Sequence, residues 1–295
     1  MRKFALLVLL AFPAFAQDAI VAGVIGDSSI VAPVVSWHRG DTLSLSLTGW
    51  TIAGEWKRNR TVASLAITPM NAYAGDRIYV DGERVTAAEF DASTLEAAFG
   101  RIDRMGKHWT SDVRAIALYD SIESENEPYA GVRARQSWHH ITAEDPLRAT
   151  FDGSEVSATA EVFVGHETWS RLRLDQRFSR RWGRVRAGES MFALYGHELG
   201  VVHAFLVGGY GYRYAEFRVD RGVGVDLDLG YAITPTIALT AHAGAMRSRD
   251  LDPRGVALDV TASIKGIALR VGIGKAHDGD EVVIYGSILA ARFLR

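Results

Sequence analysis

The chain has 295 residues, a net charge of −2 at pH 7 and no cysteine. The absence of cysteine excludes disulfides and thiolate metal sites or nucleophiles, and the near-neutral charge without a long basic run argues against nucleic acid as a partner. Hydrophobic residues make up 48% of the chain, yet no apolar run after residue 16 is long enough for a membrane-spanning helix.

The first 16 residues have the organisation of a secretory signal peptide. Arg2 and Lys3 precede an apolar run over residues 4–15, which ends at a small-residue site, Ala14-Phe15-Ala16. This pattern predicts cleavage before Gln17 and an exported chain. We predict a single domain over residues 17–295, and an exported chain without a spanning helix can cross a membrane as a closed β-barrel.

Alternation of apolar and polar residues predicts strands along the whole exported chain. Residues 42–50 place Leu43, Leu45 and Leu47 on one face and serines on the other. Further strands are predicted over residues 61–68, 95–101, 109–120, 129–140, 155–165, 170–182, 184–195 and 201–209. Residues 71–93 read as an exposed loop with a small hairpin around Asp81-Gly82.

Residues 222–233 show the alternation most clearly. Val223, Leu227 and Leu229 share one parity, whereas Asp226 and Asp228 share the other with glycines. Successive strand side chains point to opposite faces, so this strand has one apolar and one small, acidic face. A transmembrane barrel turns such an apolar face to lipid, whereas the alternative, a soluble secreted β-sandwich, buries it in a core.

The last third of the chain alternates short and long connections. Short turns are predicted at residues 234–236 and 265–266, polar loops at 247–254 and 275–280, and a closing strand at 281–293. This rhythm is typical of outer-membrane barrels. At roughly 18 to 20 residues per strand and connection, we expect about 14 antiparallel strands, within a range of 12 to 16.

The tryptophans are interpreted as interfacial girdles. Trp50, Trp138 and Trp182 are placed at predicted strand ends, and Trp109 and Trp169 at strand starts. Aromatic residues concentrate at both membrane interfaces of barrels in lipid.

The polar parity carries many arginines that are predicted to face the barrel lumen. The candidates are Arg133, Arg135, Arg171, Arg173, Arg177, Arg184 and Arg186. Two interpretations stay open: the arginines attract anions into an open pore, or Glu161 and Asp175 neutralise them in a plugged interior.

Three hairpin strands bring further polar residues together. If Ile233 lies opposite Ile237, then Asp228 lies opposite His242, and Asp259 extends this row across the next strand, diagonal to Arg270. Asp226 shares the lumen parity. The row is either an acid/base dyad or an ionic network, and no hydroxyl nearby stands in a nucleophile motif. No histidine spacing predicts a metal site, and no cofactor is expected.

The signal peptide, the amphipathic strands and the closing strand, in which Tyr285, Leu289 and Phe293 share one parity, together resemble Gram-negative outer-membrane β-barrel proteins. The resemblance implies an outer-membrane location, contact with membrane lipid, and recognition of Phe293 by the barrel-assembly machinery.

Two local stretches carry narrower resemblances. Residues 205–209, followed by an arginine-containing stretch to Arg221, resemble the C-terminal part of Omp85-type barrels, which insert or export other proteins. Residues 127–131, Glu-Pro-Tyr-Ala-Gly, resemble a stretch in barrel lipid A deacylases. We predict a porin-like passive channel or a structural envelope protein rather than an enzyme. The alternatives are an Omp85-like barrel, a lipid-modifying enzyme using His242, and the soluble sandwich.

Overall fold

A computed structural model describes residues 19–27, 31–40, 42–48, 51–69, 78–80, 83–85, 92–122, 125–145, 150–200, 203–208, 216–249, 252–275 and 282–293. The predicted signal peptide, Trp50, the hairpin tip at residues 81–82 and the last two residues lie outside this part of the chain. Within it, no helix is both long and apolar enough to cross a bilayer.

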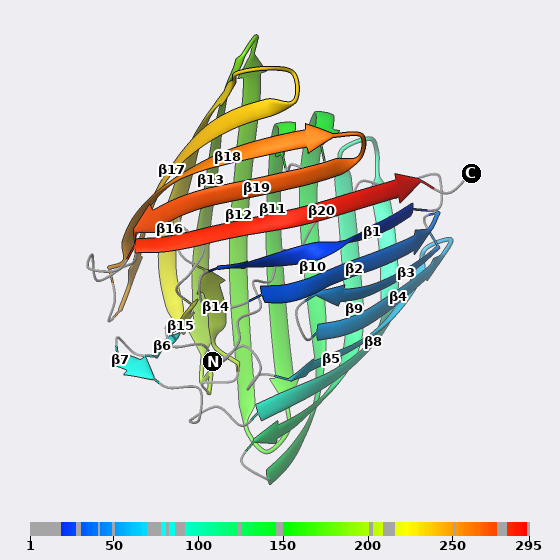
Figure 1. The fold of residues 1–295 in the computed structure, drawn as a ribbon. Helices are drawn as coiled ribbons and strands as arrows, with labels where there is room; N and C mark the ends of the chain where they lie inside the picture. Colours follow the sequence, from blue (N-terminus) through cyan, green and yellow to red (C-terminus); the bar gives the residue numbers. More distant parts are fainter. Residues whose placement is uncertain are drawn as a thin grey trace.

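Sixteen strands form one closed barrel in which neighbouring strands are paired in chain order (Figure 1). They are β1 (Ala19–Asp27), β2 (Val31–Arg39), β3 (Leu43–Thr48), β4 (Thr51–Arg58), β5 (Thr61–Pro69), β8 (Ala92–Met105), β9 (Trp109–Ile122), β10 (Glu125–Asp145), β11 (Thr150–Val164), β12 (Thr168–Trp182), β13 (Val185–His197), β16 (Arg221–Ala232), β17 (Ile237–Ser248), β18 (Arg254–Ile264), β19 (Ile267–Lys275) and β20 (Val282–Phe293). The predicted closed antiparallel barrel is confirmed.

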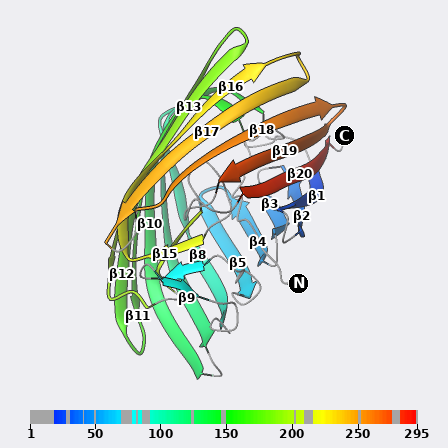
Figure 2. The same ribbon diagram turned by 60° about the vertical axis from the view of Figure 1, so that its left-hand side comes forward.

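The strand number lies at the top of the predicted range and above the central estimate of 14. The excess arises on the side formed by the first strands, where β3 has 6 residues and β4 has 8. The opposite side is tall, because β10 has 21 residues. Figure 2 shows the tall green strands β10–β13 on one side and the short blue strands β1–β5 on the other.

The first and last strands close the barrel. β1 pairs with β20 from Ala19 opposite Phe293 to Asp27 opposite Tyr285, so the sheet has no free edge. A Cβ atom on Gly23 would lie 1.9 Å from the backbone oxygen of Ile288. Glycine is therefore required for the close approach of the two strands at this closure.

The two ends of the barrel differ in their connections. We call the end where β12 meets β13 and β18 meets β19 the turn end, and the opposite end the loop end. At the turn end, Ile264 pairs with Ile267, and Lys265 and Gly266 have φ values of 49° and 82°. Two consecutive residues with positive φ make the tight hairpin that the sequence predicts.

The outer face is apolar. On β16 the outward residues Val223, Leu227 and Leu229 are 56%, 49% and 58% exposed, and the same parity rule holds on the neighbouring strands. Such a wall of exposed aliphatic side chains is stable only when lipid covers it. The soluble sandwich alternative is therefore wrong, because the sheet closes with its apolar side chains outward instead of around a core.

Two loop-end connections contribute a small second sheet with the order β14-β15-β6-β7, seen beside the loop end in Figure 1. Its strands are β14 (Phe205–Gly208), β15 (Glu216–Val219), β6 (Ile78–Val80) and β7 (Glu83–Val85). Val80 pairs with Glu83, as expected for the predicted hairpin. The expectation of a barrel strand at residues 201–209 is wrong, because of the described residues 203–208 only Phe205–Gly208 form a strand, which belongs to this small sheet. Its apolar run does not alternate as a barrel strand does.

The tryptophans form a girdle mainly at one end. Trp56, Trp109 and Trp182 are 41%, 49% and 51% exposed near the turn end, and Trp138 lies opposite Trp109 within β10 rather than at its end. Trp169 is only 2% exposed. It shares the parity of Arg171 and faces the interior, so its assignment to an outer girdle is wrong.

Candidate functional site

Ion pairs between neighbouring strands hold the predicted arginines of β10 and β12 on the interior face. Glu161 on β11 is 5% exposed and accepts hydrogen bonds from the Nε atoms of Arg133 and Arg171. Both terminal nitrogens of Arg133 also donate to the two carboxylate oxygens of Glu96, each at 2.8 Å. Two arginines and two glutamates thus alternate along one row, so their charges cancel.

The next interior row is looser. Arg173 donates to Asp175 two residues along the same strand at 2.7 Å. Glu155 lies between two arginines, with Arg177 Nη1 at 3.5 Å and Arg135 Nη2 at 3.7 Å. The sequence identified Asp175 and Glu161 as counter-charges, but not Glu96 or Glu155, which share the same interior parity.

A buried carboxylate organises the last strands. The Asp259 side chain is 1% exposed, and its Oδ2 atom lies 2.9 Å from His242 Nε2 and 2.8 Å from Arg270 Nε. Tyr285 donates its hydroxyl to the same oxygen at 3.1 Å, and its ring lies over Gly272. Among the described residues, the hydrogen-bond contacts of His242 are to Asp259 and Arg270, so these side chains form an ionic network.

The predicted register is correct between β16 and β17 and shifted between β17 and β18. Asp228 lies opposite His242 as predicted, but it pairs with Arg186 on the other side at 3.0 Å. Asp259 lies opposite Thr240 rather than His242, because β18 is displaced by two residues. The diagonal distance is still short enough for the His242–Asp259 contact.

A polar cavity of about 570 Å³ lies toward the turn end. Its interior lining includes Arg177, Arg186, Asp226, Asp228, His242, Asp259 and Arg270. Gly183 and Pro235, from two turns, border it, so it lies at the turn-end mouth. Arg184 also borders it, but as an exposed turn residue rather than the predicted start of a strand.

Above this cavity, the connection between β13 and β14 enters the barrel at the loop end. His203 is 7% exposed, stacks on Trp169 with ring centroids 4.2 Å apart, and meets Tyr129 edge-on at 5.2 Å. Its Nε2 lies 3.3 Å from Oδ2 of the fully buried Asp120. Burial and the nearby Arg171 guanidinium lower the pKa of His203 to about 4.

Arg171 fastens this connection to the barrel wall. It donates a hydrogen bond to the backbone oxygen of His203 at 3.2 Å, and its Cζ atom lies 5.6 Å and 5.8 Å from the ring centroids of Trp169 and Phe205. A cation over an aromatic face is attracted by the ring quadrupole. The sequence predicts Arg171 as a charge that lines a pore. In the structure its guanidinium instead anchors the inserted connection, and we call the interior part of that connection, with Leu199, His203 and Phe205, the plug.

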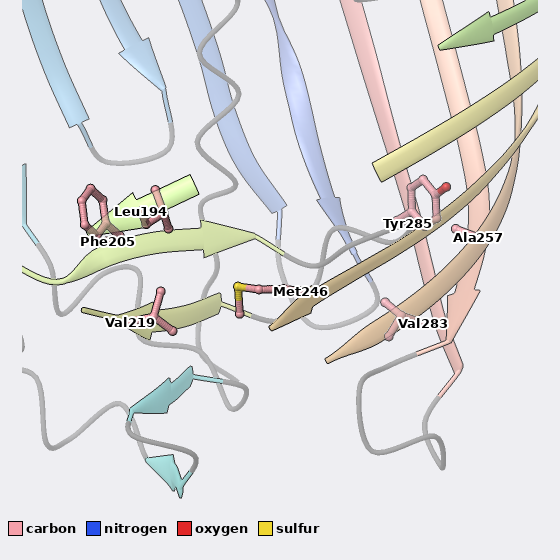
Figure 3. Packing of buried hydrophobic residues seen from close by; sticks show 7 residues of the cluster. All are labelled: Leu194, Phe205, Val219, Met246, Ala257, Val283 and Tyr285. Carbon is pink, nitrogen blue, oxygen red and sulfur yellow. The ribbon is translucent and has the colours of Figure 1, made fainter. Parts of the chain in front are cut away.

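An apolar cluster packs the loop strands against the barrel wall at the loop end. Phe205 and Val219, from the two loop strands β14 and β15, are each 5% exposed and belong to one cluster with barrel residues (Figure 3). The barrel contributes Leu194, Met246, Ala257, Val283 and Tyr285. Leu199 packs against both this cluster and the aromatic one around Trp169. A Cβ on Gly196 would lie 2.1 Å from Leu199 Cδ1, so glycine permits that approach.

The sequence does not predict the interior contacts of Leu199, His203 and Phe205. One feature of the sequence does indicate such contacts. Trp169 and Phe163 share the parity of the charged interior residues, so they are expected to face the interior and to need an apolar partner there.

No protein-family model matches the sequence, and the search of curated proteins finds no relative. The fold is similar to solved outer-membrane β-barrels. CdiB from Acinetobacter baumannii matches with a TM-score of 0.63 and 11% identity over 94% of this chain and 60% of that chain. BamA from Haemophilus ducreyi, lacking POTRA domains 1–3, matches with a TM-score of 0.63 and 8% identity over 94% of this chain and 70% of that chain. CdiB from Escherichia coli matches with a TM-score of 0.54 and 11% identity over 96% of this chain and 64% of that chain.

At this level of identity the comparison shows the fold. The chain spans about three fifths of the A. baumannii CdiB chain that it matches. The closed barrel thus holds an inserted connection at its loop end and a polar cavity at its turn end, and several of its interior charges are paired.

Proposed function

We propose that this protein is an outer-membrane barrel of the Omp85 type, closed at rest, which assists another polypeptide in entering the membrane. The observation that carries the proposal is the connection between β13 and β14, whose residues Leu199, His203 and Phe205 pack inside the barrel at the loop end, while a polar cavity lies at the turn end. A passive pore needs a continuous path, and this arrangement supports a protein that opens only when a substrate engages it. The likeness to BamA and CdiB over most of the chain supports the same choice.

The interior charges argue in the same direction. An anion-selective pore requires unpaired guanidinium groups along the path, but Arg133, Arg171 and Arg186 each contact a carboxylate. Their field at a passing ion is therefore reduced.

The test is a folding assay in liposomes. Liposomes that contain the purified protein receive a small outer-membrane barrel unfolded in urea, and its heat-modifiable gel mobility reports insertion over time. We expect insertion several-fold faster than in liposomes with an equal amount of a plain porin. Equal rates in the two preparations would contradict the proposal.

A passive channel is the second candidate, favoured by the polar cavity alone. It predicts steady ion conductance, and replacing Arg171 and Arg173 by Glu would shift the reversal potential toward cation selectivity. The enzyme alternative predicts lipid turnover that His242→Ala abolishes, and the ionic surroundings of His242 do not favour it.

A further inference from the structure

A repeated pairing of tryptophan with a cation follows the outer face at the turn end. Residues two apart in a strand share a face, and three such pairs lie within strands near this end: Trp37–Arg39, Trp56–Arg58 and Arg180–Trp182. A fourth cation, Lys107, lies in the turn two residues before the outward Trp109. We call this set the turn-end collar.

The collar points toward the surroundings of the barrel. Val35, on the same parity as Trp37 and Arg39, is 41% exposed, and Ile52, on the same parity as Trp56 and Arg58, is 58% exposed. Arg180 lies over the ring of Trp182 with its Cζ atom 5.7 Å from the centroid. The tryptophans therefore lie against the lipid region with cations beside them.

The cations of the collar are not neutralised within the described part of the chain. Arg39, Arg58, Lys107 and Arg180 are all exposed, and none of them forms an ion pair with a described residue. The interior arginines, in contrast, are held by Glu96, Glu161 or Asp228. Unlike those interior arginines, the collar cations therefore have no counter-charge among the described residues.

The described strands lack this combination on their outer face at the loop end. Arg247, Arg254 and Lys275 are exposed there, but no tryptophan stands within two residues of any of them, and Trp169 faces the interior. Among the described residues, the pairing on the outer face therefore occurs at the turn end.

Elementary chemistry indicates what such a collar recognises. The indole ring prefers the interface between hydrocarbon and headgroups, and an arginine or lysine beside it extends its charge to the level of the phosphates. Cations near an anionic surface are attracted by about 1 kcal/mol each. We propose that the turn-end collar binds the phosphate headgroups of anionic phospholipids, of the phosphatidylglycerol class, in the leaflet at the turn end.

This inference rests on one part of the proposed function, the embedding of the barrel in lipid, and not on the handling of a polypeptide. The collar tryptophans serve as the reporters. The purified barrel is reconstituted in bilayers of phosphatidylcholine and phosphatidylglycerol, with bromine on the acyl chains of one lipid or the other, and tryptophan fluorescence is measured. We expect stronger quenching by the brominated phosphatidylglycerol, and a preference that declines as salt screens the charges.

Two triple variants with equal loss of charge make the comparison. The collar variant replaces Arg39, Arg58 and Arg180 by Gln, and we expect its relative affinity for phosphatidylglycerol to fall by about fivefold per cation, the equivalent of about 1 kcal/mol. The loop-end variant replaces Arg247, Arg254 and Lys275 by Gln, and we expect its quenching preference to match that of the unchanged protein. Heat-modifiable mobility shows that each variant is folded.

The outcomes separate the possible failures. Absence of quenching by either lipid would show that the barrel is not embedded and would remove the basis of both proposals. Equal quenching by the two lipids in the unchanged protein, or an equal loss of preference in both variants, would overturn only the collar. Equal quenching combined with binding of poly-glutamate would assign the collar to an acidic protein segment instead and would overturn the lipid proposal.

Discussion

Arg171 illustrates how one side chain combines several roles at the residue scale. Its Nε atom pairs with Glu161, its Nη1 atom binds the loop backbone at His203, and its charge lies near Trp169 and Phe205. These contacts join the barrel strands β11 and β12 to the inserted connection, so we expect the loss of this side chain to affect the plug more than the barrel wall.

The variant Arg171→Gln should therefore open the plug while leaving the barrel folded. Loss of a charge-assisted hydrogen bond costs about 1.5 to 3 kcal/mol, which is large for a single loop. Conductance in planar bilayers should rise. Arg177→Gln is the matched control, because Arg177 is more exposed and lies 3.5 Å from Glu155; equal conductance changes in the two variants would disprove the anchoring role.

A second residue-scale prediction concerns Gly272. A Cβ there would lie 2.3 Å from the Tyr285 ring and 2.7 Å from Asp259 Cβ, so Gly272→Ala must displace the tyrosine that donates to Asp259. We expect destabilisation of roughly 1 to 3 kcal/mol, measured as a lower temperature of conversion in heat-modifiable mobility. Gly230→Ala should have little effect, since its nearest contact would be 3.5 Å away. An unchanged conversion temperature for Gly272→Ala would contradict this packing.

At the element scale, adjacent residues of β16 point to opposite faces of the barrel wall. Leu227 is 49% exposed on the outer face, whereas Asp226 borders the interior cavity. Leu227→Arg should block assembly, because a charge on the lipid face near mid-membrane costs roughly 2 to 4 kcal/mol. Asp226→Asn should assemble. Recovery of both variants in outer membranes at equal levels would refute the assignment of faces.

The inserted connection should respond to acid through His203. Asp120 from β9, Glu127 and Tyr129 from β10, and Arg171 from β12 surround this imidazole or lie near it. Because its pKa is lowered from 6.5 to about 4 in the docked loop, a released loop binds a proton more readily than a docked one. The contribution of His203 to docking is therefore fully present above pH 6.5 and is lost as the pH falls from about 6.5 toward 4.

Bilayer conductance measured across this pH range tests the effect. We expect opening on acidification, and the His203→Gln variant, which has no imidazole to protonate, should lack the step. An identical acid response in both proteins would show that another group controls the loop.

For the whole molecule, alternation within the sequence predicts the barrel, the parity of each face and the hairpin at Lys265-Gly266. These features are local, because strand faces repeat every two residues and a tight turn depends on its own two residues. The pairing of Asp228 with its opposite residue His242 follows in the same way from one turn.

The rest depends on distant parts of the chain. Closure of the barrel and its interior volume set the remaining features, and the sequence of a single strand encodes neither. These features are the two-residue stagger of β18, the short strands β3 and β4, and the packing of Leu199, His203 and Phe205 into the barrel. The tryptophans at strand termini predict a girdle at both ends of the barrel. Trp169 instead faces the interior, where its ring stacks on His203 of the inserted connection.

The central claim is that the barrel is closed at its loop end by its own chain, and single-channel recording in planar bilayers tests it most directly. At neutral pH the unchanged protein should stay closed for most of the recording. The double variant Leu199→Ser with Phe205→Ser, which removes the apolar contacts of the plug, should conduct steadily and with weak ion preference, since the interior arginines remain paired. A steady, strongly anion-selective conductance in the unchanged protein, with no change in the double variant, would contradict the account.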